Sequence, residues 1–173
     1  MTDIGEALQL DSADADATMR IGCAIGRCCV AGDVIALDGE LGAGKTQFVR
    51  GLAEGLGLDP RAVSSPTFVI VQEYDTAGAG GVLVGGVEAL IHIDAYRLRS
   101  AEDLASVGWE GDGSAMREGT VVAIEWASLL GEALPDDHLA VRIEHEPVGR
   151  SLGLIARGRW VLRMAEIGRA LAL

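Results

Sequence analysis

The sequence predicts an α/β domain of three layers, with a central sheet that is mixed, mostly parallel, and antiparallel at one edge. Three observations favour this class. Short apolar runs typical of buried strands recur along the chain. One run leads through a glycine-rich loop into a segment of helical periodicity, as in a strand–loop–helix unit. After residue 135 apolar and polar residues alternate, which is typical of antiparallel strands with one buried face.

The elements can be placed in order along the chain. An early helix is expected to contain Thr18 and the three cysteines, and the apolar run Val34–Leu37 predicts a buried strand. Apolar residues at helical spacing predict a helix of about thirteen residues from 45 onward, which stops at Gly57. Later apolar runs predict strands at 67–72, 89–94, 121–126, 139–144 and 152–155, and an amphipathic helix at 160–173.

Length and local charge predict how the chain is organised. Its 173 residues are close to the roughly 150 of one domain, so residues 18–173 are expected to form a single domain. Residues 1–17 contain five acids and no base, and we expect a frayed N-terminus there. This acidic start is the reverse of a signal peptide, and no apolar run reaches the roughly 18 residues of a membrane span. A cytoplasmic protein without a membrane partner is therefore expected.

The net charge of the chain disfavours one class of binding partner. The chain has 14 basic and 26 acidic residues, a net charge of −12, which disfavours direct, nonspecific binding to nucleic acid. Residues 142–173 carry six arginines and three acids, and this basic portion is either a contact surface or a solvated helix face. Cys23, Cys28 and Cys29 are odd in number and form no C-x-x-C pair, so reduced thiols are expected rather than a disulfide or zinc site.

The clearest functional motif contains the one lysine of the chain, Lys45. It lies in Gly39–Thr46, a full match to the phosphate-binding pattern G-x-x-x-x-G-K-[ST], between the predicted strand and helix. Glycines let such a loop curl with its N–H groups inward, and the helix N-terminus adds a partial positive charge. Lys45 is expected to reach the β- and γ-phosphates, and Thr46 to bind Mg²⁺. The remaining expected nucleotide contacts in this loop are Gly42, Ala43 and Gly44.

Two acids at strand ends are candidates for the chemistry. Asp94 and Glu125 each end an apolar run, and ligands of open α/β sheets bind at the carboxyl ends of strands. We therefore expect both carboxylates to converge on Mg²⁺ and the terminal phosphate. His92 points to the same face of its strand as Asp94 and either orders the site or is a structural histidine.

Three further positions leave alternatives open. Pro66 favours an extended backbone before it, so residues 64–68, with the Thr67 hydroxyl, are either a sensor of the γ-phosphate or a plain loop into the next strand. Arg97 either stabilises charge in the transition state or, as we favour, belongs to a partner surface. Trp109 is either an interface anchor or a lid over the core.

Four blocks of the sequence together resemble the TsaE (YjeE) family. The resemblance covers about residues 32–150, and the blocks occur in the order found in that family. They are G-E-L-G-A-G-K-T at 39–46, S-P-T-F at 65–68 followed by E-Y at 73–74, H-I-D-A-Y-R-L at 92–98, and I-E-W at 124–126.

The resemblance implies a P-loop NTPase-like ATPase required for threonylcarbamoyladenosine modification of tRNA. It implies ATP with Mg²⁺ as ligands and docking to a TsaB–TsaD complex, which ATP hydrolysis resets. The family protein alone is expected to hydrolyse ATP slowly. The resemblance thus implies that the protein acts on tRNA only indirectly, through the TsaB–TsaD complex.

The same resemblance implies roles for individual residues. Lys45 matches the phosphate-binding lysine, and Thr46 and Glu125 match the two magnesium ligands. Asp94 matches a catalytic acid, and Thr67 matches a segment that faces the terminal phosphate. The resemblance further suggests nucleotide contacts from Trp126, Arg150 and, near the adenine, Thr18. Glu40 stands where aspartate is more usual, and residues 76–86 are expected to be a long glycine-rich hairpin tip.

Two other functions fit the phosphate-binding loop. A small-molecule kinase would transfer phosphate to an acceptor, but such enzymes usually carry a substrate-binding half and an arginine-rich lid. A nucleotide-gated binding module would keep Lys45 and Thr46 but would not need Asp94 or Glu125. An Asp94→Ala variant that binds ATP without hydrolysing it would separate the ATPase from this binding module.

Overall fold

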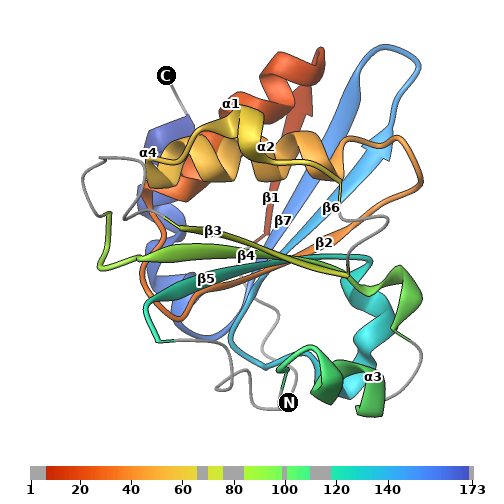
Figure 1. Ribbon diagram of the computed structural model, residues 1–173. Coiled ribbons are helices and arrows are strands. Elements are labelled where there is room, and N and C mark those ends of the chain that lie inside the picture. The colour runs from red at the N-terminus through yellow and green to blue at the C-terminus, as the bar shows by residue number, and fades with distance from the viewer. Residues whose placement is uncertain (1–6, 66–69, 76–83, 99–100, 110–117, 172–173) are drawn as a thin grey trace.

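The computed structural model describes residues 7–65, 70–75, 84–98, 101–109 and 118–171, which form a seven-stranded sheet with helices on both faces (Figure 1). The strands are β1 (Ala7–Ser12), β2 (Val34–Asp38), β3 (Val71–Asp75), β4 (Ala89–Asp94), β5 (Thr120–Glu125), β6 (Leu139–His145) and β7 (Arg150–Ala156). The α-helices are α1 (Ala15–Arg27), α2 (Lys45–Leu56), α3 (Ala101–Ser106) and α4 (Met164–Leu171). Short 3₁₀ helices are η1 (Pro60–Ala62), η3 (Ala95–Arg97), η4 (Ala127–Ala133) and η5 (Gly158–Arg163).

The sheet order β1-β7-β6-β2-β5-β4-β3 confirms a mixed, mostly parallel sheet. The neighbours β6, β2, β5 and β4 are parallel, so their carboxyl ends meet at one edge of the molecule. Antiparallel pairing occurs at both sides of the sheet rather than at one. β6 pairs with β7 and β3 with β4, and each of these pairs is consecutive in the chain. β1 pairs with β7 at the edge of the sheet.

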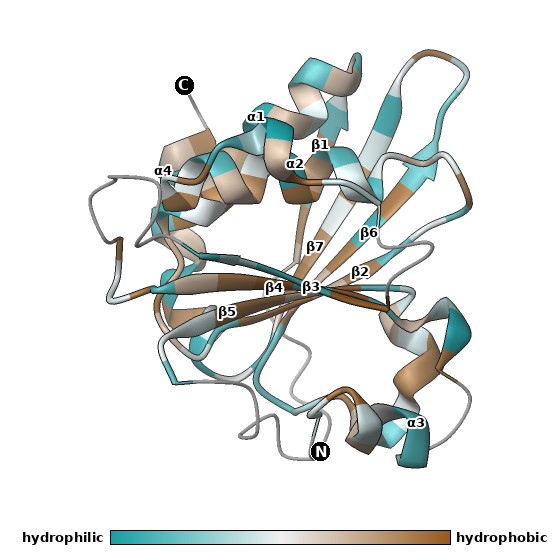
Figure 2. Ribbon diagram, in the orientation of Figure 1, coloured by the Kyte–Doolittle hydropathy of each residue, from teal (hydrophilic) through white to brown (hydrophobic). Residues whose placement is uncertain are grey.

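Two hydrophobic clusters fill the spaces between the sheet and the helices on its two faces. The larger one packs α1, α2 and α4 against one face of the sheet, and includes Phe48, Leu52 and Trp160. The smaller one packs the opposite face, where η4 and α3 lie below β4 and β5 (Figure 1). Every residue of β4 is buried, and this strand is hydrophobic over most of its length (Figure 2). Trp109 belongs to the smaller cluster and its Nε1 donates to the carbonyl of Ala133 at 2.9 Å, which favours the core alternative over an interface anchor.

Four glycines let α1 and α2 pack with their backbones in contact, and we call them the glycine seam. They are Gly22, Gly26, Gly51 and Gly55, spaced four residues apart in each helix. A Cβ atom on Gly51 would lie 1.9 Å from the carbonyl oxygen of Met19, and one on Gly22 would lie 2.2 Å from that of Phe48. No side chain fits in this space, so the seam fixes α2 at a close distance from α1.

The N-terminal region differs from the prediction of a frayed segment over residues 7–17. β1 pairs with β7 along all of Ala7–Ser12, and the Asp14 carboxylate accepts the Ala17 amide at 2.7 Å to cap α1. Leu8 and Leu10 alternate with polar residues and pack against the larger cluster. This short alternation is the signal for an edge strand; residues 1–6 lie outside the described ranges.

The C-terminal helix is shorter than predicted, because residues 158–163 form η5 before α4 begins at Met164. Arg163 ends η5 and pairs with Asp33 through two hydrogen bonds of 2.6 Å, which ties this segment to the start of β2. Gly57 adopts a left-handed backbone and ends α2, as predicted.

The cysteines are free thiols, as expected, and all three are buried. Cys23 lies in α1, whereas Cys28 and Cys29 follow the last turn of that helix. Burial raises the pKa of all three thiols, most strongly that of Cys29, which disfavours the reactive thiolate. Among the described residues, no helix is both long and apolar enough to cross a bilayer.

Candidate nucleotide-binding site

The phosphate loop, residues 39–44, connects the end of β2 to the start of α2, as the motif requires. Gly39, Gly42 and Gly44 all have positive φ, at 151°, 80° and 112°. A Cβ atom on Gly39 would lie 2.4 Å from the carbonyl oxygen of Ile143, so only glycine fits there. Gly42, in contrast, has no heavy atom within 4 Å of its ideal Cβ position, so this side of the loop is open to a ligand.

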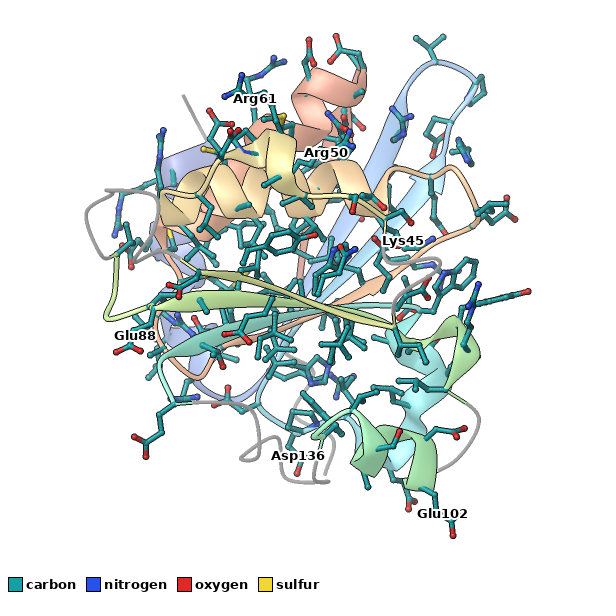
Figure 3. All side chains as sticks on the ribbon, viewed as in Figure 1. Lys45, Arg50, Arg61, Glu88, Glu102 and Asp136 are labelled. Atoms are coloured by element: carbon teal, nitrogen blue, oxygen red, sulfur yellow. The ribbon has the colours of Figure 1, made fainter. Side chains whose placement is uncertain are left out.

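Lys45 lies at the carboxyl edge of the sheet and is almost fully buried (Figure 3). Its Nζ donates to the carbonyl oxygens of Gly39 at 2.7 Å and Glu40 at 2.9 Å, so the side chain folds back onto the start of the loop. The same atom lies 3.9 Å from the ring centroid of Trp126, a cation–π contact. Burial lowers the pKa of Lys45, and the nearby Glu125, Asp94 and Asp38 carboxylates oppose this shift.

Thr46 and Glu125 are joined directly, although they are 79 residues apart in the chain. The Thr46 hydroxyl donates to Glu125 Oε1 at 2.8 Å. The same oxygen lies 2.9 Å from His92 Nε2, and the ring of His92 is fully buried. The end of β5, the start of α2 and the middle of β4 therefore meet at one carboxylate.

Asp94 lies beside Glu125, because these residues are register partners on the parallel strands β4 and β5. One oxygen of Asp94 accepts the backbone N–H of Tyr96 at 3.0 Å, which caps η3, and the side chain is largely buried. The two strand-end acids thus converge at one edge of the sheet, as the sequence predicts.

A pocket of about 470 Å³ is bounded by Lys45, Thr46, Asp94 and Glu125, together with three of the other predicted site residues, Gly42, Gly44 and Trp126. It is lined by Leu41, Gly42, Gly44, Lys45, Thr46, Gln47, Ser65, Asp94, Tyr96, Glu125 and Trp126. Ala43 is fully buried and does not line it, so any contact from Ala43 would come through its backbone. Thr67 lies outside the described residues, and its role stays a prediction.

Thr18 and Arg150 lie together behind the phosphate loop rather than in the pocket. An ideal Cβ on Gly44 would lie 3.2 Å from Arg150 Nε and 3.7 Å from Thr18 Cγ2. Arg150 Nε is buried and has no hydrogen-bond partner among the described residues, whereas the Thr18 hydroxyl pairs with Ser12 at 2.8 Å. The loop, the start of α1 and the start of β7 thus meet at Gly44.

Aromatic side chains form one rim of the pocket. Trp126 has a left-handed backbone with φ of 60°, and no other non-glycine residue among those described has a positive φ. Its ring lies 5.2 Å from that of Tyr96, which is well exposed. Arg97 is also exposed, which favours the partner-surface alternative for that residue.

Four residues line the pocket without having been named individually as site residues: Leu41, Gln47, Ser65 and Tyr96. Ser65 and Tyr96 belong to blocks that the sequence marked, so proximity to Thr67 and Asp94 was the available signal. Leu41 occupies a variable position of the motif and Gln47 directly follows it, and nothing in their residue types pointed to a ligand. A second, larger hollow of about 700 Å³ runs along β6 and includes Gly39, Glu40 and Trp126, but it contains neither Lys45 nor Thr46.

The donor atoms of the pocket fit Mg²⁺. Thr46 and Glu125 offer hydroxyl and carboxylate oxygens, and magnesium in phosphate sites is held by one or two such protein ligands together with waters and phosphates. Within the described ranges, no group of three or more His, Cys, Asp or Glu side chains forms a cage that could hold a metal by itself. The site therefore suits a cation that arrives with a phosphate ligand.

Comparisons with known proteins give consistent results. The family model described as threonylcarbamoyl adenosine biosynthesis protein TsaE matches residues 12–152. The tRNA threonylcarbamoyladenosine biosynthesis protein TsaE of Bacillus subtilis is 43% identical over 115 residues, 65% of this chain and 62% of that protein. The match therefore spans less than two thirds of that relative's length.

Two further comparisons extend over more of the chain. The Mycobacterium tuberculosis protein of the same name is 35% identical over 145 residues, 83% of this chain and 81% of its own length. A crystal structure of Bacillus subtilis YdiB superposes with a TM-score of 0.73 at 30% identity, covering 97% of this chain and 98% of YdiB.

Proposed function

The chain belongs to the TsaE family, and on this basis we propose that it acts in the biosynthesis of threonylcarbamoyladenosine on tRNA. We propose that it does so by binding and hydrolysing ATP with Mg²⁺. One observation carries this proposal: Lys45, Thr46, Glu125 and Asp94 come from three separate elements and line one pocket beside an open glycine loop.

The phosphate loop would bind the nucleotide through its backbone N–H groups and Lys45. The ammonium group is held 2.7 and 2.9 Å from two loop carbonyls, so it is already ordered against the loop. Gly42, Ala43 and Gly44 would supply backbone donors, and the N-terminus of α2 would add its partial positive charge. Trp126, Arg150 and Thr18 are proposed as further nucleotide contacts around this loop.

Thr46 and Glu125 would hold the magnesium ion, which supplies charge neutralisation between neighbouring phosphates. Their mutual hydrogen bond of 2.8 Å places a hydroxyl and a carboxylate oxygen at one point of the pocket. Asp94 would orient the attacking water: one of its oxygens is fixed by the Tyr96 N–H, and the side chain lines the same pocket. Thr67 is proposed to sense the γ-phosphate from the segment that follows Ser65.

We further propose that the protein docks to a TsaB–TsaD complex in the cytoplasm and that hydrolysis resets this complex. Exposed apolar groups at the pocket rim support a partner surface there, since Leu41 and Tyr96 are 89% and 63% exposed. Docking at this rim would let a partner act on the nucleotide site and raise a slow intrinsic rate.

The decisive measurement is ATP turnover with Mg²⁺, by the protein alone and with TsaB and TsaD added. We expect slow turnover alone and strong stimulation by the partners. Phosphate appearing on a small-molecule acceptor would instead support a kinase. Nucleotide binding without partner-stimulated hydrolysis would support a nucleotide-gated binding module.

Asp94→Asn tests the catalytic assignment within the same assay. The variant should lose partner-stimulated hydrolysis by about 100-fold or more while ATP affinity stays within about threefold, because losing the carboxylate that orients the attacking water affects the transition state. Asp136→Asn is the matched control, since Asp136 is exposed and lies on the far side of the sheet from Lys45 (Figure 3). Equal turnover in both variants would contradict a catalytic role for Asp94.

A further inference from the structure

His92 occupies an unusual position for a histidine. It lies inside β4, in the run Ala89–Asp94, where all six residues are buried. Its Nε2 lies 2.9 Å from Glu125 Oε1, and its Nδ1 has no hydrogen-bond partner among the described residues. A structural histidine usually satisfies both ring nitrogens. The contact with Glu125 is therefore the polar interaction that accounts for His92 on this strand.

The sheet register gives the ring room to reach Glu125. His92 is the register partner of Ala123 on the neighbouring strand β5, and Glu125 is two residues further along on the same face. The small Ala123 side chain does not block the diagonal path across β5, and all three residues are buried. This local geometry links the middle of β4 to the end of β5.

Two side chains bond to the same oxygen of Glu125. The Thr46 hydroxyl donates to Oε1, and the His92 ring donates to the same oxygen in the tautomer that carries its proton on Nε2. Oε2 bonds to none of the described residues, and Glu125 lines the pocket. One carboxylate oxygen is thus held by two donors while the other is left for a ligand.

We propose that His92 is a positioning residue: its Nε2–H holds Glu125 so that Oε2 is presented to the cation that accompanies the nucleotide. This inference rests on the proposed function, because it assigns to Glu125 the role of a magnesium ligand. Outer hydrogen bonds of this kind orient the ligating carboxylate, and removing one typically costs 10- to 100-fold in metal affinity.

The experiment measures binding rather than turnover. A fluorescent ATP analogue is titrated in EDTA and over a series of Mg²⁺ concentrations, with wild type, His92→Leu and His92→Gln. For His92→Leu we expect the Mg²⁺ concentration of half-maximal effect to rise about 10-fold or more, with affinity in EDTA within about threefold of wild type. His92→Gln can place an amide N–H near the Nε2 position and should stay within about threefold of wild type in both conditions.

Controls separate positioning from a general structural role. His138→Gln changes another buried histidine, which lies just before β6 and bonds through Nδ1 to the carbonyl oxygen of Pro135. This variant should alter neither titration. If His92→Leu does not fold, His92→Asn replaces it, because the shorter asparagine amide does not reach Glu125 and should show the shift that glutamine prevents. Thermal melting verifies that each variant is folded.

The possible results have distinct meanings. An unshifted Mg²⁺ dependence in His92→Leu or His92→Asn, or a shift in His92→Gln as large as theirs, would overturn the positioning role. An equal loss of affinity in EDTA and in Mg²⁺ would also overturn it and would indicate a structural role. Wild-type binding that does not respond to Mg²⁺ would refute the proposed metal site itself, and the positioning role with it.

Discussion

Glycine serves two different purposes in the loop before α2 and within α2 itself. In the phosphate loop before the helix, glycines are needed because the backbone has positive φ, and beside Gly42 the space is open. In the glycine seam, Gly51 and Gly55 have ordinary helical backbone, and glycine is needed because α1 occupies the space of a Cβ. The loop glycines therefore keep a binding surface accessible, and the seam glycines fix the helix that carries Lys45 and Thr46.

The largest effect is expected when the seam is disrupted by Gly51→Ala. The new Cβ would lie 1.9 Å from the Met19 carbonyl oxygen and 2.9 Å from the Cys23 nitrogen, so the two helices must separate. We expect the free energy of unfolding to fall by about 3 kcal/mol, the upper part of the usual range for overpacking. Urea denaturation measures this change.

Gly168→Ala is the matched control for the seam. Gly168 lies in α4, and no atom lies within 4 Å of its ideal Cβ position. Alanine there should stabilise the protein by about 0.5–1 kcal/mol through helix propensity. If Gly51→Ala is as stable as Gly168→Ala, the close packing of α1 and α2 is not the reason for glycine in the seam.

The next largest effect is expected on nucleotide affinity, at the phosphate loop. Lys45→Ala removes a charge-assisted phosphate contact and should cost about 1.5–3 kcal/mol of nucleotide binding, roughly 10- to 150-fold in affinity. Isothermal titration with ATP and Mg²⁺ measures this loss. Arg61→Ala removes an exposed cation that pairs with Asp59 and should leave ATP affinity unchanged. Unchanged binding in Lys45→Ala would rule out the phosphate-loop assignment.

The smallest effect is expected at Gly42, where the constraint is conformational. Gly42→Ala forces a Cβ residue to adopt φ of 80° and should reduce stability by about 1 kcal/mol. Gly42→Asn should recover part of that loss, because asparagine tolerates the left-handed region. Thermal unfolding of the two variants compares them directly. Should asparagine be no better than alanine, backbone strain would not be the reason for glycine at position 42.

Local patterns made much of the fold and site predictable. The phosphate-loop motif, the apolar runs of β2, β4 and β5 and the alternation of β6 and β7 each lie within a short stretch of sequence. Asp94 and Glu125 could be placed together because parallel strands end at a common edge.

Features that depend on distant parts of the chain were missed. β1 is an edge strand because β7 lies beside it, and Leu8 and Leu10 alone are a weak signal. The α-helix begins only at Met164, after η5, where Arg163 pairs with Asp33 of the β2 entry. Helical glycines usually indicate weak helices, so the seam required knowledge of both α1 and α2. The contact between His92 and Glu125 likewise depends on the register of two strands.

The hydrogen bonds of Lys45 have a consequence for the thermodynamics of ligand recognition. Because its ammonium group is already held by Gly39 and Glu40 and lies against Trp126, the rotamer entropy of this long side chain is lost during folding. Nucleotide binding then adds phosphate oxygens to an ordered donor instead of ordering a mobile one. The ammonium donor is therefore preorganised for binding. The entropic cost of ordering the Lys45 side chain lowers the stability of the fold and does not reduce the affinity for the nucleotide.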